Sequence, residues 1–261
     1  APAARGAARF AAIPLAATGA RQAHAGMHDA RRFSRATLRD TVGGNAMYKL
    51  FWAPGTAAMA PQAALEEIGA AYEPVKLDVA AKEHEQAAYR KLNPNGRIPT
   101  LVDGDFVIFE TAAICLYLCD KHPGANLAPP AGTPARGRFY QWLVFMTNTV
   151  QVGFLDWYHP DWTFPDPERQ AALKLQAQAK LERAFGVLDG GLGAGRYLAG
   201  DRFSVCDIYL AMLARWSRNL PKPMWHWPNI KRAVAETFPR PAFQRMMQKQ
   251  GIAWAENWPK Q

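Results

Sequence analysis

The character of the sequence changes at one proline- and glycine-rich segment, HPGANLAPPAGTPARG at residues 122–137. Before this segment, short apolar runs of strand length alternate with helical patterns, whereas after it every strong pattern is helical. Alternating strands and helices are typical of an α/β unit, and helices alone are typical of an all-α unit. We therefore predict an α/β domain over residues 47–124, a linker over 125–133, an all-helical domain over 134–250 and a tail over 251–261.

The α/β domain is expected to run in the order strand, helix, strand, and then strand, strand, helix. The expected strands are YKLFWA from residue 48, YEPVKLD from residue 72, PTLV from residue 99 and FVIF from residue 106, and the expected helices are AMAPQAALEEIGA from residue 58, HEQAAYRKL from residue 84 and ETAAICLYLCDKH from residue 110. Pro74 places the second strand at a sheet edge or at a strand start, because proline cannot donate to a ladder. Asp103-Gly104 predicts a tight hairpin between the last two strands.

The all-helical domain carries two helix-start signals. Asp166 before Pro167 is expected to cap a long helix with apolar residues at spacings of three and four, and Gly190-Gly191 is expected to end it. Ser204 and Asp207 have the spacing of a capping box at the start of a later helix.

Composition excludes several classes of function. Apolar residues make up 49% of the chain, which is typical of a globular protein. The chain contains no run of about 18 apolar residues, so no membrane span is predicted. Residues 1–46 contribute +5 of the net charge of +9, so the remainder is too mildly basic to indicate nucleic-acid binding. Cys115, Cys119 and Cys206 form no CxxC pair, Cys115 and Cys119 fit inert core thiols of an apolar helix, and no His, Cys, Asp or Glu cluster has metal-ligand spacing. Few cysteines favour a reducing compartment, so we expect a cytoplasmic protein.

Residues 1–46 are rich in Ala, Arg and Gly, with seven Arg, no Lys and two Asp. One interpretation is a disordered extension or an upstream start, because Met47 opens the first strand directly. The other is a cleaved organellar leader, because such leaders are rich in Arg and poor in acidic residues. Composition supports both.

The order of these elements, with the stretch NPNGRIPTLVDGDFVIFETAAICLYL and the later Ser-x-x-Asp cap, resembles the cytosolic glutathione S-transferase family over about residues 47–250. The turn WAPGTAAMAP is similar to that of the bacterial, beta-like branch, but without its cysteine. The resemblance implies a thioredoxin-like domain followed by an all-α domain. It also implies a transferase that conjugates glutathione thiolate to small hydrophobic electrophiles, uses glutathione as co-substrate without a metal, and forms a homodimer with neither nucleic acid nor membrane as partner.

Three motifs are implied to bind glutathione. Ile98-Pro99 looks like the family's cis-proline turn, which would expose the N–H and C=O of Ile98 for pairing with the cysteinyl backbone. Glu110 and Thr111 stand at a helix start that could hold the γ-glutamyl carboxylate, with Glu110 binding the amine, although a plain helix cap is the alternative. Arg97 either contacts glutathione, as in relatives, or is a solvated surface residue.

The turn WAPGTAAMAP is expected to activate the nucleophile. In the family that the chain resembles, the nucleophile is the thiol of glutathione, so the protein need only lower the pKa of that thiol. Ala57 stands where a cysteine is expected in the beta-like branch. Two candidates remain for stabilising the thiolate. One is the hydroxyl of Thr56, the candidate catalytic side chain, and the other is the set of backbone N–H groups near Thr56 to Ala58 at the helix N-terminus.

Aromatic residues of the helical domain are candidates for the electrophile pocket. The candidates are Trp157, Tyr158, His159 and Trp162, joined by Trp52, Met59 and Trp216. A position in the core is the alternative for such a cluster, and a structural role is the alternative to a base for His159.

Two other functions are compatible with the sequence. The first is a catalytically weak glutathione- or ligand-binding or regulatory protein on the same scaffold, which Ala57 and Ala58 motivate. The second, ranked last, is thiol–disulfide or peroxide reduction, because glutathione would then have to do all the redox work.

Overall fold

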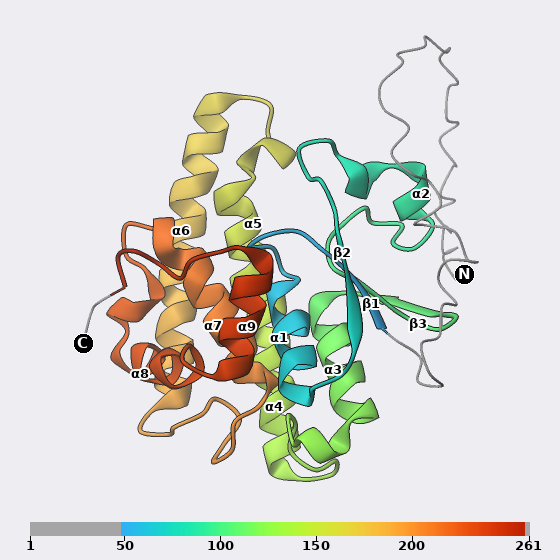
Figure 1. Cartoon of the computed structure of the whole chain (residues 1–261). Helices are drawn as coiled ribbons and strands as arrows, with labels where there is room; N and C mark the ends of the chain where they lie inside the picture. Colours follow the sequence, from blue (N-terminus) through green and yellow to red (C-terminus); the bar gives the residue numbers. More distant parts are fainter. Residues whose placement is uncertain (1–47, 259–261) are drawn as a thin grey trace, which may run out of the picture.

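The computed structural model describes residues 48–258, so the predicted extension or leader over residues 1–46 lies outside the described residues. An α/β unit comes first and an all-α unit follows, as the change in sequence pattern predicts (Figure 1). Buried apolar side chains from both units form one continuous cluster, so the two units share a core. No helix in residues 48–258 is long and apolar enough to cross a membrane.

The α/β unit is built on a four-stranded sheet with the strand order β2-β1-β3-β4. The strands are β1 (Tyr48–Trp52), β2 (Tyr72–Lys76), β3 (Thr100–Asp103) and β4 (Phe106–Phe109). β1 runs parallel to β2 and antiparallel to β3. Pro74 lies in the edge strand β2, and β3 and β4 pair as a tight hairpin, so both predictions are confirmed.

Helices cover both faces of this sheet. The helical elements are α1 (Met59–Ile68), the 3-10 turn η3 (Glu83–Glu85), α2 (Ala87–Arg90), α3 (Thr111–Lys121) and the 3-10 turn η4 (Pro123–Ala125). Leu50 and Trp52 of β1 pack with α1 and α3, whereas Phe51 packs on the other face against Tyr89 of α2. Successive side chains of a strand face opposite sides, which explains why every residue of β1 is buried.

The predicted helix HEQAAYRKL is broken in the structure. Gln86 has extended dihedral angles, φ −67° and ψ 148°, and separates η3 from α2. The buried hydroxyl of Tyr89 contacts the carbonyl oxygen of Arg97 and Oγ1 of Thr100, both at 2.7 Å. A helix this short depends on such tertiary contacts more than on its own propensity, and the sequence pattern does not show them.

Helices of the all-α unit pack against α1 (Figure 1). Its elements are α4 (Pro134–Phe145), the π-helical turn η5 (Met146–Gln151), α5 (Val152–Tyr158), the 3-10 turn η6 (Pro160–Trp162), α6 (Pro167–Leu192), α7 (Val205–Trp216), the 3-10 turns η7 (Ser217–Asn219) and η8 (Met224–His226), α8 (Pro228–Thr237) and α9 (Pro241–Gln250). Asp166 caps α6 by accepting from the N–H of Glu168 at 2.7 Å, and Ser204 and Asp207 form a capping box on α7. Both predicted caps are confirmed.

The predicted end of α6 at Gly190-Gly191 is wrong, because the helix continues to Leu192. A Cβ atom at Gly191 would lie 2.2 Å from a ring carbon of Trp142 on α4, so this glycine lets α4 and α6 approach closely. A Cβ atom at Gly190 would have no neighbour within 4 Å. Gly191 therefore serves helix packing, which overrides the stop signal that two glycines present.

Candidate functional site

Strand register brings three separate turns to one edge of the sheet. Phe51 of β1 pairs with Thr100 of β3, and Thr100 pairs with Phe109 of β4. The segments that follow Phe51 and Phe109 therefore leave the sheet beside the segment that precedes Thr100. These three segments contain the predicted site residues Thr56, Arg97, Ile98, Pro99, Glu110 and Thr111.

The segment before β3 contains a cis peptide bond between Ile98 and Pro99, as predicted. The carbonyl of Arg97 accepts hydrogen bonds from the hydroxyl of Tyr89 at 2.7 Å and from Nδ2 of Asn93 at 2.8 Å, which holds the turn in place. Within residues 48–258, the N–H and the C=O of Ile98 form no hydrogen bond. This pair of backbone groups is therefore open to an extended peptide.

The segment after β4 carries backbone strain that the sequence does not reveal. Glu110 has φ 72° and ψ 117°, a region that residues other than glycine rarely occupy and that costs about 1–3 kcal/mol. Its carboxylate is exposed, and Thr111 begins α3 directly after it. The first N–H groups of α3 and the carboxylate of Glu110 therefore lie next to each other. The N–H groups are suited to bind an anion, and the carboxylate is suited to bind an amine.

The turn after β1 uses most of its own hydrogen-bonding groups. Oγ1 of Thr56 donates to the carbonyl of Ala53 at 2.8 Å and accepts from the N–H of Ala58 at 3.4 Å. The N–H groups of Thr56 and Met59 also donate within the turn, to Ala53 and Thr56. The N–H of Ala57 has no acceptor among the described residues.

Two residues of the all-α unit hold Gly55 in this turn. The N–H of Gly55 donates to Oε1 of Gln250 on α9 at 2.9 Å, and Nε1 of Trp216 on α7 donates to the carbonyl of Gly55, also at 2.9 Å. Gly55 has φ 70°, which favours glycine. Sequence reasoning missed Gln250, because no local pattern marks a side chain that acts on a turn 195 positions away.

The structure brings together three of the predicted pocket residues. The rings of Trp157 and Tyr158 lie 4.7 Å apart, and Phe154 contacts both Tyr158 and Trp216, at 6.2 and 5.9 Å. Trp52 is buried at the end of β1, and Met59 has 0% exposed surface in the shared core. Neither of these two side chains faces an open surface.

Arg97 contacts the all-α unit. Its guanidinium carbon lies 4.0 Å from the ring centre of Trp162, and the imidazole of His159 stacks on the same indole at 4.0 Å. Burial is the main cause of a lowered pKa of His159. The charge of Asp161 raises this pKa and the charge of Arg97 lowers it, and the net shift is downward. The imidazole is therefore neutral at neutral pH and forms part of a bridge between the two units.

The cysteines lie in the core. Cys115 and Cys206 are fully buried, which raises the pKa of both thiols, and burial raises the pKa of Cys119 to about 12. Buried protonated thiols are inert. Residues 48–258 contain no group of three or more His, Cys, Asp or Glu side chains placed to hold a metal ion.

Comparison with known proteins matches both units to domains of the same protein family. A family model for the glutathione S-transferase N-terminal domain matches residues 46–120, and one for the C-terminal domain matches residues 145–241. The curated glutathione S-transferase 3 of Zea mays is 32% identical over 191 residues, 69% of this chain and 84% of that protein. Glutathione S-transferase GstA of Escherichia coli O157:H7 is 27% identical over 206 residues, 78% of this chain and 99% of that protein.

Solved structures agree with these matches. A bacterial beta class glutathione S-transferase from Sphingomonas chungbukensis is 32% identical, with a TM-score of 0.70 over 78% of this chain and 100% of that one. A sphingomonad glutathione S-transferase complexed with glutathione is 31% identical, with a TM-score of 0.69 over 78% of this chain and 100% of that one.

Proposed function

The chain belongs to the glutathione S-transferase family, and from that membership we propose that it conjugates the thiolate of glutathione to small hydrophobic electrophiles. One observation carries the proposal: three turns at one sheet edge present backbone groups without partners in residues 48–258. These groups can form hydrogen bonds with the backbone, the γ-glutamyl carboxylate and the thiol of glutathione, which is a tripeptide.

Glutathione binding is assigned to the turns before β3 and after β4. The N–H and C=O of Ile98, next to cis-Pro99, form hydrogen bonds with the backbone of the cysteinyl residue of glutathione. The ligand thereby pairs with this segment as an additional β-strand would. The N-terminus of α3 and the hydroxyl of Thr111 hold the γ-glutamyl carboxylate, and Glu110 binds the amine. Arg97 adds a positive charge beside the turn while its guanidinium stacks on Trp162.

Thiol activation is assigned to the N–H of Ala57 in preference to the hydroxyl of Thr56. The hydroxyl hydrogen of Thr56 is already donated within the turn, whereas the N–H of Ala57 has no acceptor in the described chain. Ala57 also lies just before α1, whose N-terminus favours a negative charge. A hydrogen bond to a charged acceptor contributes about 1.5–3 kcal/mol, which lowers a thiol pKa by about 1–2 units.

The electrophile is assigned to the aromatic surface of the all-α unit beside the turn. Trp216 reaches the turn directly through its bond to Gly55, and Tyr158 and Trp157 continue the aromatic cluster from it. We leave Trp52 and Met59 out of this pocket because both are buried. An apolar pocket that excludes water favours small hydrophobic electrophiles.

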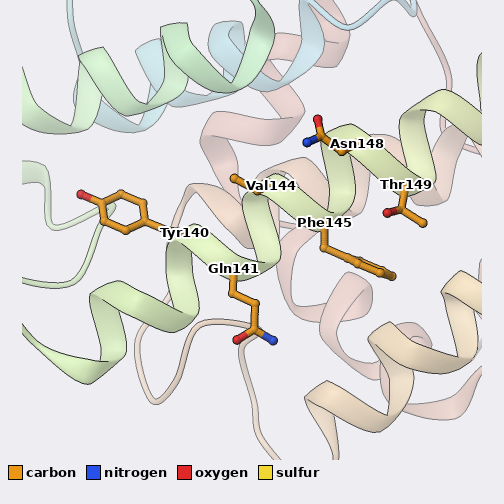
Figure 2. A pocket seen from close by; sticks show the side chains of 6 residues that line it. All are labelled: Tyr140, Gln141, Val144, Phe145, Asn148 and Thr149. Carbon is orange, nitrogen blue, oxygen red and sulfur yellow. The ribbon is translucent and has the colours of Figure 1, made fainter. Parts of the chain in front are cut away.

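A homodimer is the proposed assembly. Phe106 on β4 and Tyr140 and Val144 on α4 are large apolar residues with 48%, 44% and 53% of their surface exposed. Tyr140 and Val144 line a shallow hollow along α4 and η5 (Figure 2). Exposed apolar side chains around a hollow are typical of an interface, and a second copy of the chain is the proposed occupant of the hollow that Tyr140 and Val144 line.

Calorimetry with glutathione and a conjugation assay with an activated aryl chloride test the function. We expect binding, turnover, and about tenfold weaker binding for Thr111→Val, because one hydrogen bond to a carboxylate is lost. Thr147→Val, which removes an exposed hydroxyl on η5 outside the three turns of the proposed site, is the matched control and should bind glutathione as the wild type does. Absence of both binding and turnover in the wild type would contradict the proposal, and binding without turnover would favour the ligand-binding alternative.

A further inference from the structure

We infer that Gln250 and Trp216 are positioning residues for thiol activation, because together they fix the turn that presents the N–H of Ala57 to the sulfur. The inference rests on the proposed function and extends it to two residues of the all-α unit. Neither side chain needs to touch the thiol. Each acts through Gly55, which lies two positions before Ala57 in the chain.

Gly55 is held through the peptide groups on both of its sides. Its N–H, which belongs to the peptide from Pro54, donates to Gln250 at 2.9 Å. Its C=O, which belongs to the peptide to Thr56, accepts from the indole of Trp216 at 2.9 Å. With both peptide planes held, the backbone angles of Gly55 are fixed at the entrance to α1.

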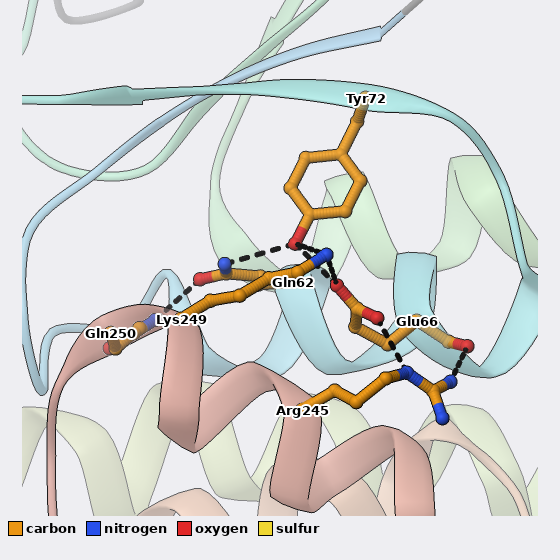
Figure 3. Close-up of polar contacts among 6 residues, drawn as sticks. All are labelled: Gln62, Glu66, Tyr72, Arg245, Lys249 and Gln250. Carbon is orange, nitrogen blue, oxygen red and sulfur yellow. Dashed lines mark hydrogen bonds and ion pairs between the residues drawn. The ribbon is translucent and has the colours of Figure 1, made fainter.

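The side chain of Gln250 is itself held by a row of hydrogen bonds (Figure 3). Nε2 of Gln250 donates to Oε1 of Gln62 at 2.8 Å, and Nε2 of Gln62 donates to the hydroxyl of Tyr72 at 3.0 Å. That hydroxyl donates to Oε1 of Glu66 at 2.6 Å. Each donor in the row, from the N–H of Gly55 onward, points toward Glu66, so the row has one direction.

Glu66 anchors the far end of this row. Its carboxylate also accepts from Nε of Arg245 at 2.9 Å and from Nζ of Lys249, both on α9. Burial and the bond to Glu66 raise the pKa of Tyr72, so its hydroxyl keeps its proton and donates at neutral pH. The direction of the row requires that Oε1 of Gln250 faces Gly55, because its amide nitrogen must face Gln62.

A positioning role can be distinguished from a purely structural one. Gln62 and Gln250 are buried and each forms hydrogen bonds through both its amide oxygen and its amide nitrogen, so their loss costs stability whatever they do for catalysis. A structural role would weaken the binding of every glutathione analogue. A positioning role changes the ionisation of the thiol while the binding of an analogue without a thiol remains.

The test uses Gln250→Met, which keeps the length of the side chain and removes both hydrogen bonds. Gln248→Met is the matched control, because Gln248 is exposed on the same helix. The thiol pKa of bound glutathione is read from the ultraviolet absorbance of the thiolate across pH, and S-methylglutathione binding is measured by calorimetry. We expect the pKa in Gln250→Met to rise by about one unit, with kcat/KM about tenfold lower below that pKa. S-methylglutathione binding should change less than about twofold, and Gln248→Met should match the wild type.

Trp216→Phe provides the second arm, since it removes the bond to the carbonyl of Gly55 and keeps an aromatic ring. It should raise the thiol pKa in the same direction, and it decides the question if Gln250→Met does not fold. An unchanged thiol pKa in a folded variant, or parallel loss of glutathione and S-methylglutathione binding, overturns the inference. Failure of the wild type to bind glutathione is a different result, because it removes the proposed function itself.

Discussion

The hydroxyl of Thr56 faces back into its own turn, although Thr56 is the side chain that the sequence offers for catalysis. It donates to the carbonyl of Ala53 at 2.8 Å, and the N–H of Ala57 is left as a donor of this turn with no acceptor among the described residues. A backbone donor is independent of residue type, so an alanine can provide the N–H that we propose for thiol activation. At the scale of the residue, the proposed thiol activation depends on where the backbone N–H of Ala57 points, and not on a side chain.

This division of roles predicts a mild effect for Thr56→Val. We expect a loss of about 1 kcal/mol in the free energy of unfolding, and less than about tenfold loss in kcat/KM, because one hydrogen bond within the turn disappears. Thr147→Val is the control, since its hydroxyl makes a similar bond to a carbonyl three residues earlier, at 2.9 Å. A collapse of turnover in Thr56→Val with glutathione binding intact would instead identify the hydroxyl as the thiol's donor.

At the scale of the element, the packing of α4 on α6 predicts opposite effects at two adjacent glycines. Gly191→Ala places a Cβ atom 2.2 Å from a ring carbon of Trp142 and should lower the free energy of unfolding by about 1–3 kcal/mol. Gly190→Ala meets nothing within 4 Å and should raise it by about 0.5–1 kcal/mol, because alanine favours a helix interior. Urea denaturation of both variants measures the difference, and equal effects would contradict the packing role of Gly191.

The contact of α9 with α1 predicts a dependence of stability on pH. Burial alone would raise the pKa of Glu66, but hydrogen bonds from Lys249, Tyr72 and Arg245 offset burial and hold it below its ordinary value. A lowered carboxyl pKa stabilises the folded state above the unfolded pKa of about 4.3, and that stability is lost as pH falls through the folded pKa. Glu66→Gln should therefore cost about 2 kcal/mol at neutral pH, and the difference from the wild type should shrink in acid.

Urea denaturation across pH measures this difference. Glu256→Gln, a substitution of an exposed glutamate near the C-terminal end of the described chain, serves as the control and should differ little from the wild type at any pH. A constant difference between Glu66→Gln and the wild type down to about pH 3 would show that the charge of Glu66 does not contribute.

At the scale of the whole molecule, the proposed homodimer predicts that a charge introduced on the exposed surface of α4 separates the two copies. Val144→Glu should shift the protein from dimer to monomer in sedimentation velocity, because a buried unpaired carboxylate is costly. Val187→Glu is a close control, since Val187 is a valine with 52% of its surface exposed on another helix, α6. Equal sedimentation of both variants and the wild type would place the interface elsewhere.

Local signals in the sequence predict much of this molecule. The order of elements, the edge position of Pro74 and the cap at Asp166 each depend on neighbouring residues, and the structure confirms them. The contact of Gln250 with Gly55 depends on how the two units pack, so no short stretch of sequence contains it. The backbone angle of Glu110 is also invisible in the sequence, because glutamate gives no sign of a positive φ.

The bond between Gly55 and Gln250 also bears on the order of events during synthesis on the ribosome. All four strands of the sheet lie within residues 48–109, so a nascent chain carries the sheet residues long before α9 is made. The partner of Gly55 follows 195 positions later in translation. Most of the residues proposed to bind the tripeptide are thus translated first, whereas the residue proposed to align its reactive centre is made only with α9, so the proposed site cannot be complete before α9 has been translated and packed against α1.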